Sequence, residues 1–181
     1  MLRLLQAIIP DLVLDLVYAT PHNFTGQSLY PPSAAAYLAL KPRERLKRVQ
    51  QRLQKQRLRL KVFDAYRPLS VQKKIWEIFP DPRYVADPRI GSCHNRGAAV
   101  DVTLVDDQRK ELPMPSGFDD FSERSHCDFL PSDPALAHNR GLLREAMVQE
   151  GFLPCISEWW HFDDPEWESY PLLDISFEEL S

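Results

Sequence analysis

Residues 98–105, with the sequence AAVDVTLV, constrain the fold of this chain most, because they place one carboxylate inside an otherwise apolar segment. The β-branched content predicts a strand. Alternation along that strand would set Asp101 on one face with Ala99 and Thr103. An ionised carboxylate in such a setting costs several kcal/mol unless a cation or hydrogen-bond donors compensate it. We therefore expect Asp101 to face a cation, and zinc would supply that compensation.

The hydrophobic pattern around this strand predicts both helices and strands. Helices are expected over 33–57, from Ser70 through Trp76, and from Pro134, after an Asp133 cap, to Glu150. Further strands are expected over 12–18, 58–63, 152–156 and 159–162. The irregular stretch 106–132 is long for a compact domain, so we expect it to cover a site.

The composition fits one domain over residues 1–181, with 44% hydrophobic and 27% charged residues. The net charge of -4 provides no overall attraction to nucleic acid. Residues 41–61 carry ten Lys and Arg against one acid, Glu44. Because the apolar stripe of the same segment needs a core, we interpret these cations as a solvated helix face and expect no nucleic-acid partner.

No segment predicts export or membrane insertion. The apolar N-terminus is interrupted by Pro10, Asp11 and Asp15, so we interpret it as part of the domain and not as a signal peptide. No later segment reaches the roughly 18 uncharged apolar residues that a membrane span needs. The three cysteines cannot all pair with one another, which favours the reducing cytoplasm.

Two histidines and two carboxylates have the chemistry of a hydrolytic metal site. His94 lies in a turn shortly before Asp101, and His161 follows Glu158 by three positions. Two His and one Asp as ligands, with a free carboxylate nearby, are the inventory of a zinc site that keeps a position open for water. The spacing of Glu158 and His161 puts them on opposite sides of a regular strand. We expect a turn or bulge near Glu158 that brings both to the metal, where Glu158 would take a proton.

Arg67 is the other charged residue in an unusual setting, since it follows directly after a predicted strand. A guanidinium there could stabilise an oxyanion, being permanently charged and rigidly forked. The alternative is an ion pair with Asp64 or another buried carboxylate. Cys93 is a further candidate metal ligand, but its side chain should point away from a metal held by the neighbouring His94.

Three motifs in this order resemble the D-alanyl-D-alanine dipeptidases, the family that includes the vancomycin-resistance type. They are the segments DAYRP at 64–68, SCHNRGAAVD at 92–101 and EWWH at 158–161. Segments at 18–26 and 114–125 also resemble the family, so the likeness runs along nearly the whole chain. The resemblance implies a single α+β domain with a small, mainly antiparallel sheet flanked by helices, more distantly similar to D,D-carboxypeptidases and the hedgehog domain.

The resemblance also implies a role for each matching residue. One zinc ion per chain would be held by His94, Asp101 and His161, with Glu158 as the base and Arg67 as the oxyanion stabiliser. Substrate-binding roles are implied for Asp119, which would meet the amino group, for Ser92 and for Tyr18. The family often has a second serine where this chain has Cys93, so its contacts to the substrate carboxylate should differ.

The implied activity is zinc-dependent hydrolysis of D-alanyl-D-alanine or a closely related D,D-dipeptide, linked to turnover of peptidoglycan precursors. One alternative is a D,D-carboxypeptidase that acts on longer cell-wall peptides through an open cleft. Another is a zinc-stabilised binding module without catalysis, which the presence of both Glu158 and Arg67 disfavours.

Overall fold

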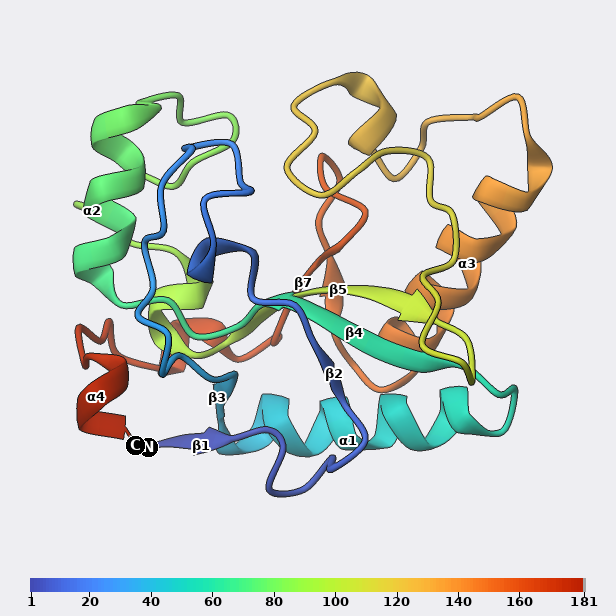
Figure 1. Ribbon diagram of the computed structural model, residues 1–181, viewed down its shortest axis with the longest axis horizontal. Coiled ribbons are helices and arrows are strands. Elements are labelled where there is room, and N and C mark those ends of the chain that lie inside the picture. The colour runs from blue at the N-terminus through green and yellow to red at the C-terminus, as the bar shows by residue number, and fades with distance from the viewer. Residues whose placement is uncertain (181) are drawn as a thin grey trace.

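The strands form two sheets in the computed structural model, which describes residues 1–180. Within these residues, the larger sheet has five strands in the order β2-β4-β5-β7-β6 (Figure 1). Its members are β2 (Val13–Leu14), β4 (Arg59–Asp64), β5 (Ala99–Val105), β7 (His161–Asp163) and β6 (Leu153–Pro154). β2 and β4 pair in parallel, and the other neighbours pair antiparallel. The smaller sheet pairs β1 (Leu2–Leu4) with β3 (Tyr37–Ala39). The expected α+β fold with a mainly antiparallel sheet is confirmed.

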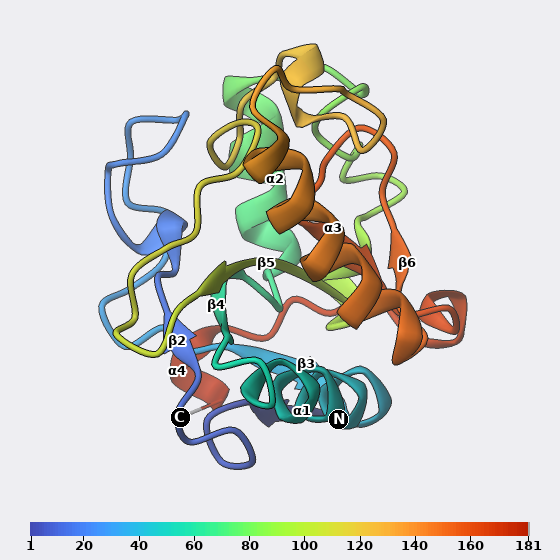
Figure 2. The ribbon, with the colours of Figure 1, turned by 90° about the vertical axis from the view of Figure 1, so that its right-hand side faces the viewer.

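Helices cover the larger sheet from both sides. They are α1 (Leu40–Gln54), α2 (Leu69–Ile78), α3 (Pro134–Gln149) and the short α4 (Phe177–Leu180). Both views place α1 below the sheet, whereas α2 and the turn Glu123–Ser125 lie above it (Figures 1 and 2). The predicted apolar stripe of α1 is buried in the core, and α3 contributes Leu143 and Met147 to the same core. Burial of these faces supplies the main stabilisation of the helices.

The expectation of a helix over 33–57 is wrong at its beginning. Residues Tyr37–Ala39 form β3, and α1 begins only at Leu40. The backbone groups of β3 pair with β1, in a register that places Tyr37 opposite Leu4. This partner lies more than thirty positions away in the sequence, so local helical periodicity does not reveal it.

The other predicted elements are found with small shifts in their ends. β4, β5, α2 and α3 match the strands and helices expected in their places. The Asp133 side chain caps α3 by accepting a hydrogen bond of 2.8 Å from the Ala135 amide. The expected early strand is shorter, because β2 ends at Leu14 and a 3-10 turn, Val17–Ala19, follows it. The segment 106–132 is irregular apart from the 3-10 turn Glu123–Ser125 and an isolated bridge at Glu111.

Several cations of the basic segment form ion pairs with acids from distant parts of the chain. Glu150, at the end of α3, accepts from Arg48 at 2.9 Å and from Arg52 at 2.7 Å. Arg45 contacts the buried carboxylate of Asp164 at 3.0 Å. The charged face of α1 is therefore partly engaged in contacts to other elements and is not merely solvated.

No helix within residues 1–180 has the length and apolar character needed to cross a membrane.

Candidate metal and catalytic site

β5 and β7 bring two of the predicted ligands together. Every residue of β5 is buried, and the antiparallel register places Asp101 directly opposite His161. Directly opposed side chains on one sheet face are within contact distance. The sheet therefore positions these two side chains although sixty residues separate them in the sequence.

The third ligand candidate, His94, belongs to the 3-10 turn Cys93–Arg96 just before β5. Ser92 caps this turn: its hydroxyl accepts from the His94 amide at 3.2 Å, and its own amide donates to the Asn95 side chain at 2.7 Å. Gly97 then reverses the chain with a φ of 63°, where a Cβ would lie 2.3 Å from a Leu2 methyl. Only glycine fits this tight connection, which delivers His94 to the start of β5.

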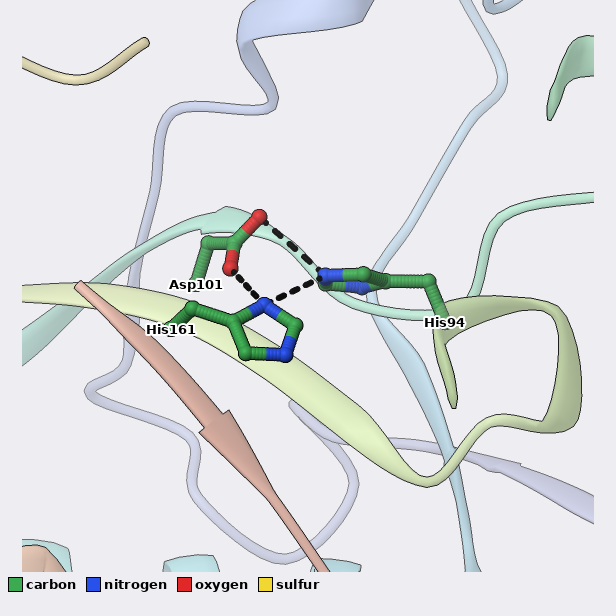
Figure 3. A group of neighbouring side chains, drawn as sticks. All are labelled: His94, Asp101 and His161. Carbon is green, nitrogen blue, oxygen red and sulfur yellow. Dashed lines mark hydrogen bonds and ion pairs between the residues drawn. The ribbon is translucent and has the colours of Figure 1, made fainter. Parts of the chain in front are cut away.

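The three side chains point at one another (Figure 3). His161 Nδ1 lies 2.9 Å from Asp101 Oδ1, and His94 Nε2 lies 3.3 Å from Asp101 Oδ2. The two facing ring nitrogens are 3.2 Å apart. Two imidazole nitrogens and a carboxylate oxygen that converge in this way form a donor set that could hold a metal ion.

The outer nitrogen of each imidazole has an acceptor that fixes its tautomer. His94 Nδ1 donates to the Ala65 carbonyl at 2.6 Å, and His161 Nε2 donates to Asp163 Oδ1 at 3.0 Å. In the neutral rings both outer nitrogens carry the hydrogen, so both inner nitrogens present lone pairs toward Asp101. Lone pairs that face one another beside a carboxylate repel unless a cation lies among them, so the residues fit a metal ion.

Charge favours the ionised form of Asp101. Burial alone would raise the pKa of its carboxyl, but His94 and His161 outweigh burial and hold the pKa below its ordinary value. Without a metal ion, burial would lower the pKa of His161, yet its hydrogen bonds to Asp101 and Asp163 raise it well above the usual value, so the inner nitrogen holds a proton that a bound metal ion would replace. The carboxylate is therefore in the form that a metal ion requires.

Glu158 approaches the same point from the turn that precedes β7. The His161 amide donates to the Glu158 carbonyl at 3.2 Å, and the Glu158 carboxylate lies 3.9 Å from His161 Nδ1. The expected turn near Glu158 is therefore confirmed. Burial raises the pKa of Glu158, against the opposing effect of His161. A carboxyl group with a raised pKa is suited to accepting and returning a proton near neutral pH.

Arg67 follows β4 and forms the ion pair considered as its alternative role. Its Nε and Nη2 donate to Asp64 Oδ2 at 2.9 and 2.7 Å, and its Nη1 donates to Gln72 Oε1 at 2.9 Å. Burial disfavours its charge, but Asp64 with Tyr18 and Tyr30 raises its pKa well above the ordinary value. A guanidinium has five N–H donors and these contacts use three, so Arg67 can also donate into the cavity that it lines.

The three predicted substrate-binding residues lie at the same cavity. Asp119 has a left-handed backbone with a φ of 56°, and its carboxylate accepts from the Tyr18 hydroxyl at 2.9 Å. Burial raises the pKa of Asp119 well above the usual value, and Asp101 adds to this effect. Ser92 uses its oxygen to cap the turn of His94, which leaves the hydroxyl hydrogen for another acceptor.

The cavity has a volume of about 310 Å³ and joins the predicted site residues to an apolar wall. Its polar side holds His94, Asp101, His161, Glu158, Arg67, Asp119, Ser92 and Tyr18. The apolar part of the lining includes Ile75, Tyr84 and Phe121. Phe121 stacks on Phe79, at the C-terminal end of α2, with ring centroids 5.1 Å apart. This contact packs the segment 106–132 against α2. That segment therefore contributes Asp119 and Phe121 to the lining of the cavity.

Sequence reasoning missed Asp163 and the apolar wall. Asp163 lies two positions after His161 in β7, so both point to one face of the strand. That spacing was a usable signal. The aromatic side chains of the wall come from three distant segments, and no local pattern relates them.

Cys93 lines the same cavity as the three ligand candidates but is not one of the converging ligand atoms. Its thiol hydrogen-bonds to Asp163, and burial raises its pKa to about 12. A thiol with this pKa is a poor source of the thiolate that binds zinc. The group of converging ligand atoms found within residues 1–180 consists of His94, Asp101 and His161 and does not include Cys93.

Comparison with known proteins gives one consistent result. A family model described as D-Ala-D-Ala dipeptidase matches residues 1–178. A D-alanyl-D-alanine dipeptidase of Escherichia coli is 42% identical over 173 residues, which cover 96% of this chain and 89% of the relative. Proteins of the same description from Enterococcus faecium and Streptomyces coelicolor are 30% and 33% identical, over 92% and 86% of this chain and 94% and 89% of their own lengths.

Proposed function

The chain belongs to the D-Ala-D-Ala dipeptidase family of metallopeptidases, and from this premise we propose that it hydrolyses D-alanyl-D-alanine at a zinc ion held by His94, Asp101 and His161. The convergence of these three donor atoms, all within 4.8 Å of one another, carries the proposal. Zinc fits because it prefers nitrogen and oxygen ligands and leaves a position open when only three protein groups bind it.

The roles of the surrounding side chains follow from their positions. When bound, the metal supplies a Lewis acid for the scissile carbonyl and lowers the pKa of a water. Glu158, with its raised pKa, accepts a proton from the attacking water and passes it to the departing amine. Arg67, which lines the same cavity, donates hydrogen bonds to the oxyanion that develops on the carbonyl.

Substrate recognition is assigned to the two ends of the dipeptide. Asp119 receives the ammonium group, and the site favours a cation there because Asp101, Asp119 and Glu158 line the same cavity. Occupation by an ammonium would also stabilise the charged form of Asp119, whose pKa is raised by burial. The Ser92 hydroxyl donates to the substrate carboxylate.

The position of Asp119 at the cavity favours a dipeptide over a longer peptide. The segment 106–132 brings both Asp119 and Phe121 to the cavity, so it forms part of the wall where the ammonium is proposed to bind. A longer peptide would have to place a neutral amide against Asp119 and leave its charge unpaired. This loss of affinity disfavours the carboxypeptidase alternative.

A metal assay paired with a peptide panel tests the proposed function. We expect one zinc per chain and hydrolysis of D-Ala-D-Ala, with little turnover of L-Ala-L-Ala or of a pentapeptide that ends in D-Ala-D-Ala. Faster turnover of the pentapeptide would support the carboxypeptidase instead. Bound metal without any turnover would support the binding module.

We also propose a cytoplasmic location, for which the free state of Cys93, Cys127 and Cys155 is the support. Cell fractionation that recovers the protein mainly outside the cytoplasm would contradict this.

A further inference from the structure

We propose that Gln72 is a positioning residue that fixes the guanidinium of Arg67 at the cavity. This inference rests on the proposed role of Arg67 in the reaction. Gln72 lies in the first turn of α2, and its side chain is completely buried. Gln72 also lines the cavity, but both polar atoms of its side chain are bonded to Arg67 and Ala86, so we infer that it acts through Arg67.

Gln72 bridges Arg67 and the wall of the cavity. Its Oε1 accepts from Arg67 Nη1 at 2.9 Å, and its Nε2 donates to the Ala86 carbonyl at 2.8 Å. These two bonds fix the orientation of the amide, because a flipped amide would turn a donor toward the guanidinium and an acceptor toward the carbonyl. Ala86 itself lines the cavity. Arg67 is thereby tied to the loop that follows α2.

Asp64 alone leaves one rotation of the guanidinium open. Both bonds from Arg67 to Asp64 end on the same oxygen, Oδ2. The other oxygen, Oδ1, accepts from the Tyr30 hydroxyl at 2.7 Å and from the Ala65 amide at 2.9 Å. A planar group held through a single oxygen can pivot about that atom. A contact at Nη1, on the opposite edge of the guanidinium, opposes this pivot.

The face of the guanidinium is held by a different contact. The Tyr18 ring lies against it, with the central carbon of Arg67 5.0 Å from the ring centroid. Tyr18 limits movement out of the plane, whereas Gln72 limits rotation within it. Groups that stabilise a developing charge lose much of their effect when they are displaced by as little as an ångström. The contact with Gln72 is therefore expected to affect the transition state more than the ground state.

Gln72→Met tests this role because methionine has a similar volume and offers neither hydrogen bond. We expect kcat for D-Ala-D-Ala to fall about 10-fold with KM changed less than about 2-fold, since a misplaced oxyanion donor costs on this order or more. Gln72→Glu keeps an acceptor for Arg67 Nη1 and should recover most of kcat. Gln72→Asn, whose side chain is too short to reach both partners, takes the place of Gln72→Met if that variant does not fold.

Gln50→Met is the matched control. Gln50 is also a buried glutamine on a helix, and its Oε1 accepts from the Leu60 amide at 2.9 Å, in a part of the chain away from the cavity. This variant should lose stability to a similar extent and keep kcat. An equal loss of kcat in Gln50→Met and Gln72→Met would show a general effect of destabilisation and would overturn the proposal.

The double variant Arg67→Lys with Gln72→Met separates this inference from the proposed function. If Gln72 acts through the guanidinium, adding Gln72→Met to Arg67→Lys should change kcat by less than about 2-fold, because no fork remains to be oriented. A full additional loss of kcat would overturn the role of Gln72. Normal kcat in Arg67→Lys alone would instead remove the proposed role of Arg67, and with it this inference. Reduced kcat in Arg67→Lys with normal kcat in Gln72→Met would remove the role of Gln72 only.

Discussion

Replacing Asp64 by asparagine should destabilise the protein strongly, because Asp64 neutralises a buried charge and accepts hydrogen bonds from several directions. Its side chain is completely buried, and its two oxygens accept from Tyr30, Ala65 and Arg67. Asparagine has one accepting oxygen in place of two. Whichever way it turns, its NH₂ group faces donors, and the Arg67 charge loses its nearest counter-ion.

The expected size follows from the burial of this pair. Breaking a buried ion pair by removing one partner costs about 3–5 kcal/mol, because the remaining charge stays desolvated. For a chain of 181 residues, each kcal/mol corresponds to about 2–4 °C in Tm, so Asp64→Asn should lower Tm by about 6–20 °C. Thermal and urea unfolding of the metal-loaded protein, followed by circular dichroism, would measure this loss.

Asp15→Asn is the control for this measurement. Asp15 pairs with Lys61 at 2.7 Å, but half of its side chain is exposed, so its loss should cost less than about 1 kcal/mol. A cost below about 1 kcal/mol for Asp64→Asn as well would refute the argument from buried charge. A second check replaces both partners: Arg67→Met should cost less in the Asp64→Asn background than in the wild type, because the unpaired charge is then gone.

Three further predictions concern the site itself. The first concerns the proposed ligands His94, Asp101 and His161: chelation, or replacement of any one of them by alanine, should remove metal and activity together. Full metal retention in two of the three alanine variants would refute the assignment. Glu158→Gln should keep the metal and the fold while kcat falls by about 10²-fold or more, and an unchanged kcat would exclude Glu158 as the proton carrier. Asp119→Asn should raise KM for D-Ala-D-Ala more than it lowers kcat, because it removes the charge opposite the ammonium; an unchanged KM would place the ammonium elsewhere.

The local sequence was sufficient to predict a feature wherever that feature depends only on a residue and its near neighbours in the chain. A carboxylate within an apolar β-branched segment indicated a compensated site at Asp101, and β5 is buried throughout. The cap at Asp133 and the glycine after α3, Gly151 with a φ of 90°, marked the two ends of that helix. In each case, short-range physical chemistry determines the outcome: alternation along a strand, capping of free amides, and the positive φ that glycine accepts.

Only the tertiary structure decided which of several possible partners each polar group has. Arg67 has Asp64 three positions away, but whether its remaining nitrogen meets Gln72, and which wall Gln72 is tied to, depends on how α2 and the following loop pack. The thiol of Cys93 points to Asp163, seventy residues later, and β3 forms because β1 lies beside it. Such contacts are set by the packing of segments that are distant in the chain. Each of these contacts contributes to stability only after the sheet has brought its partners together. Residue type and local periodicity therefore do not predict such contacts.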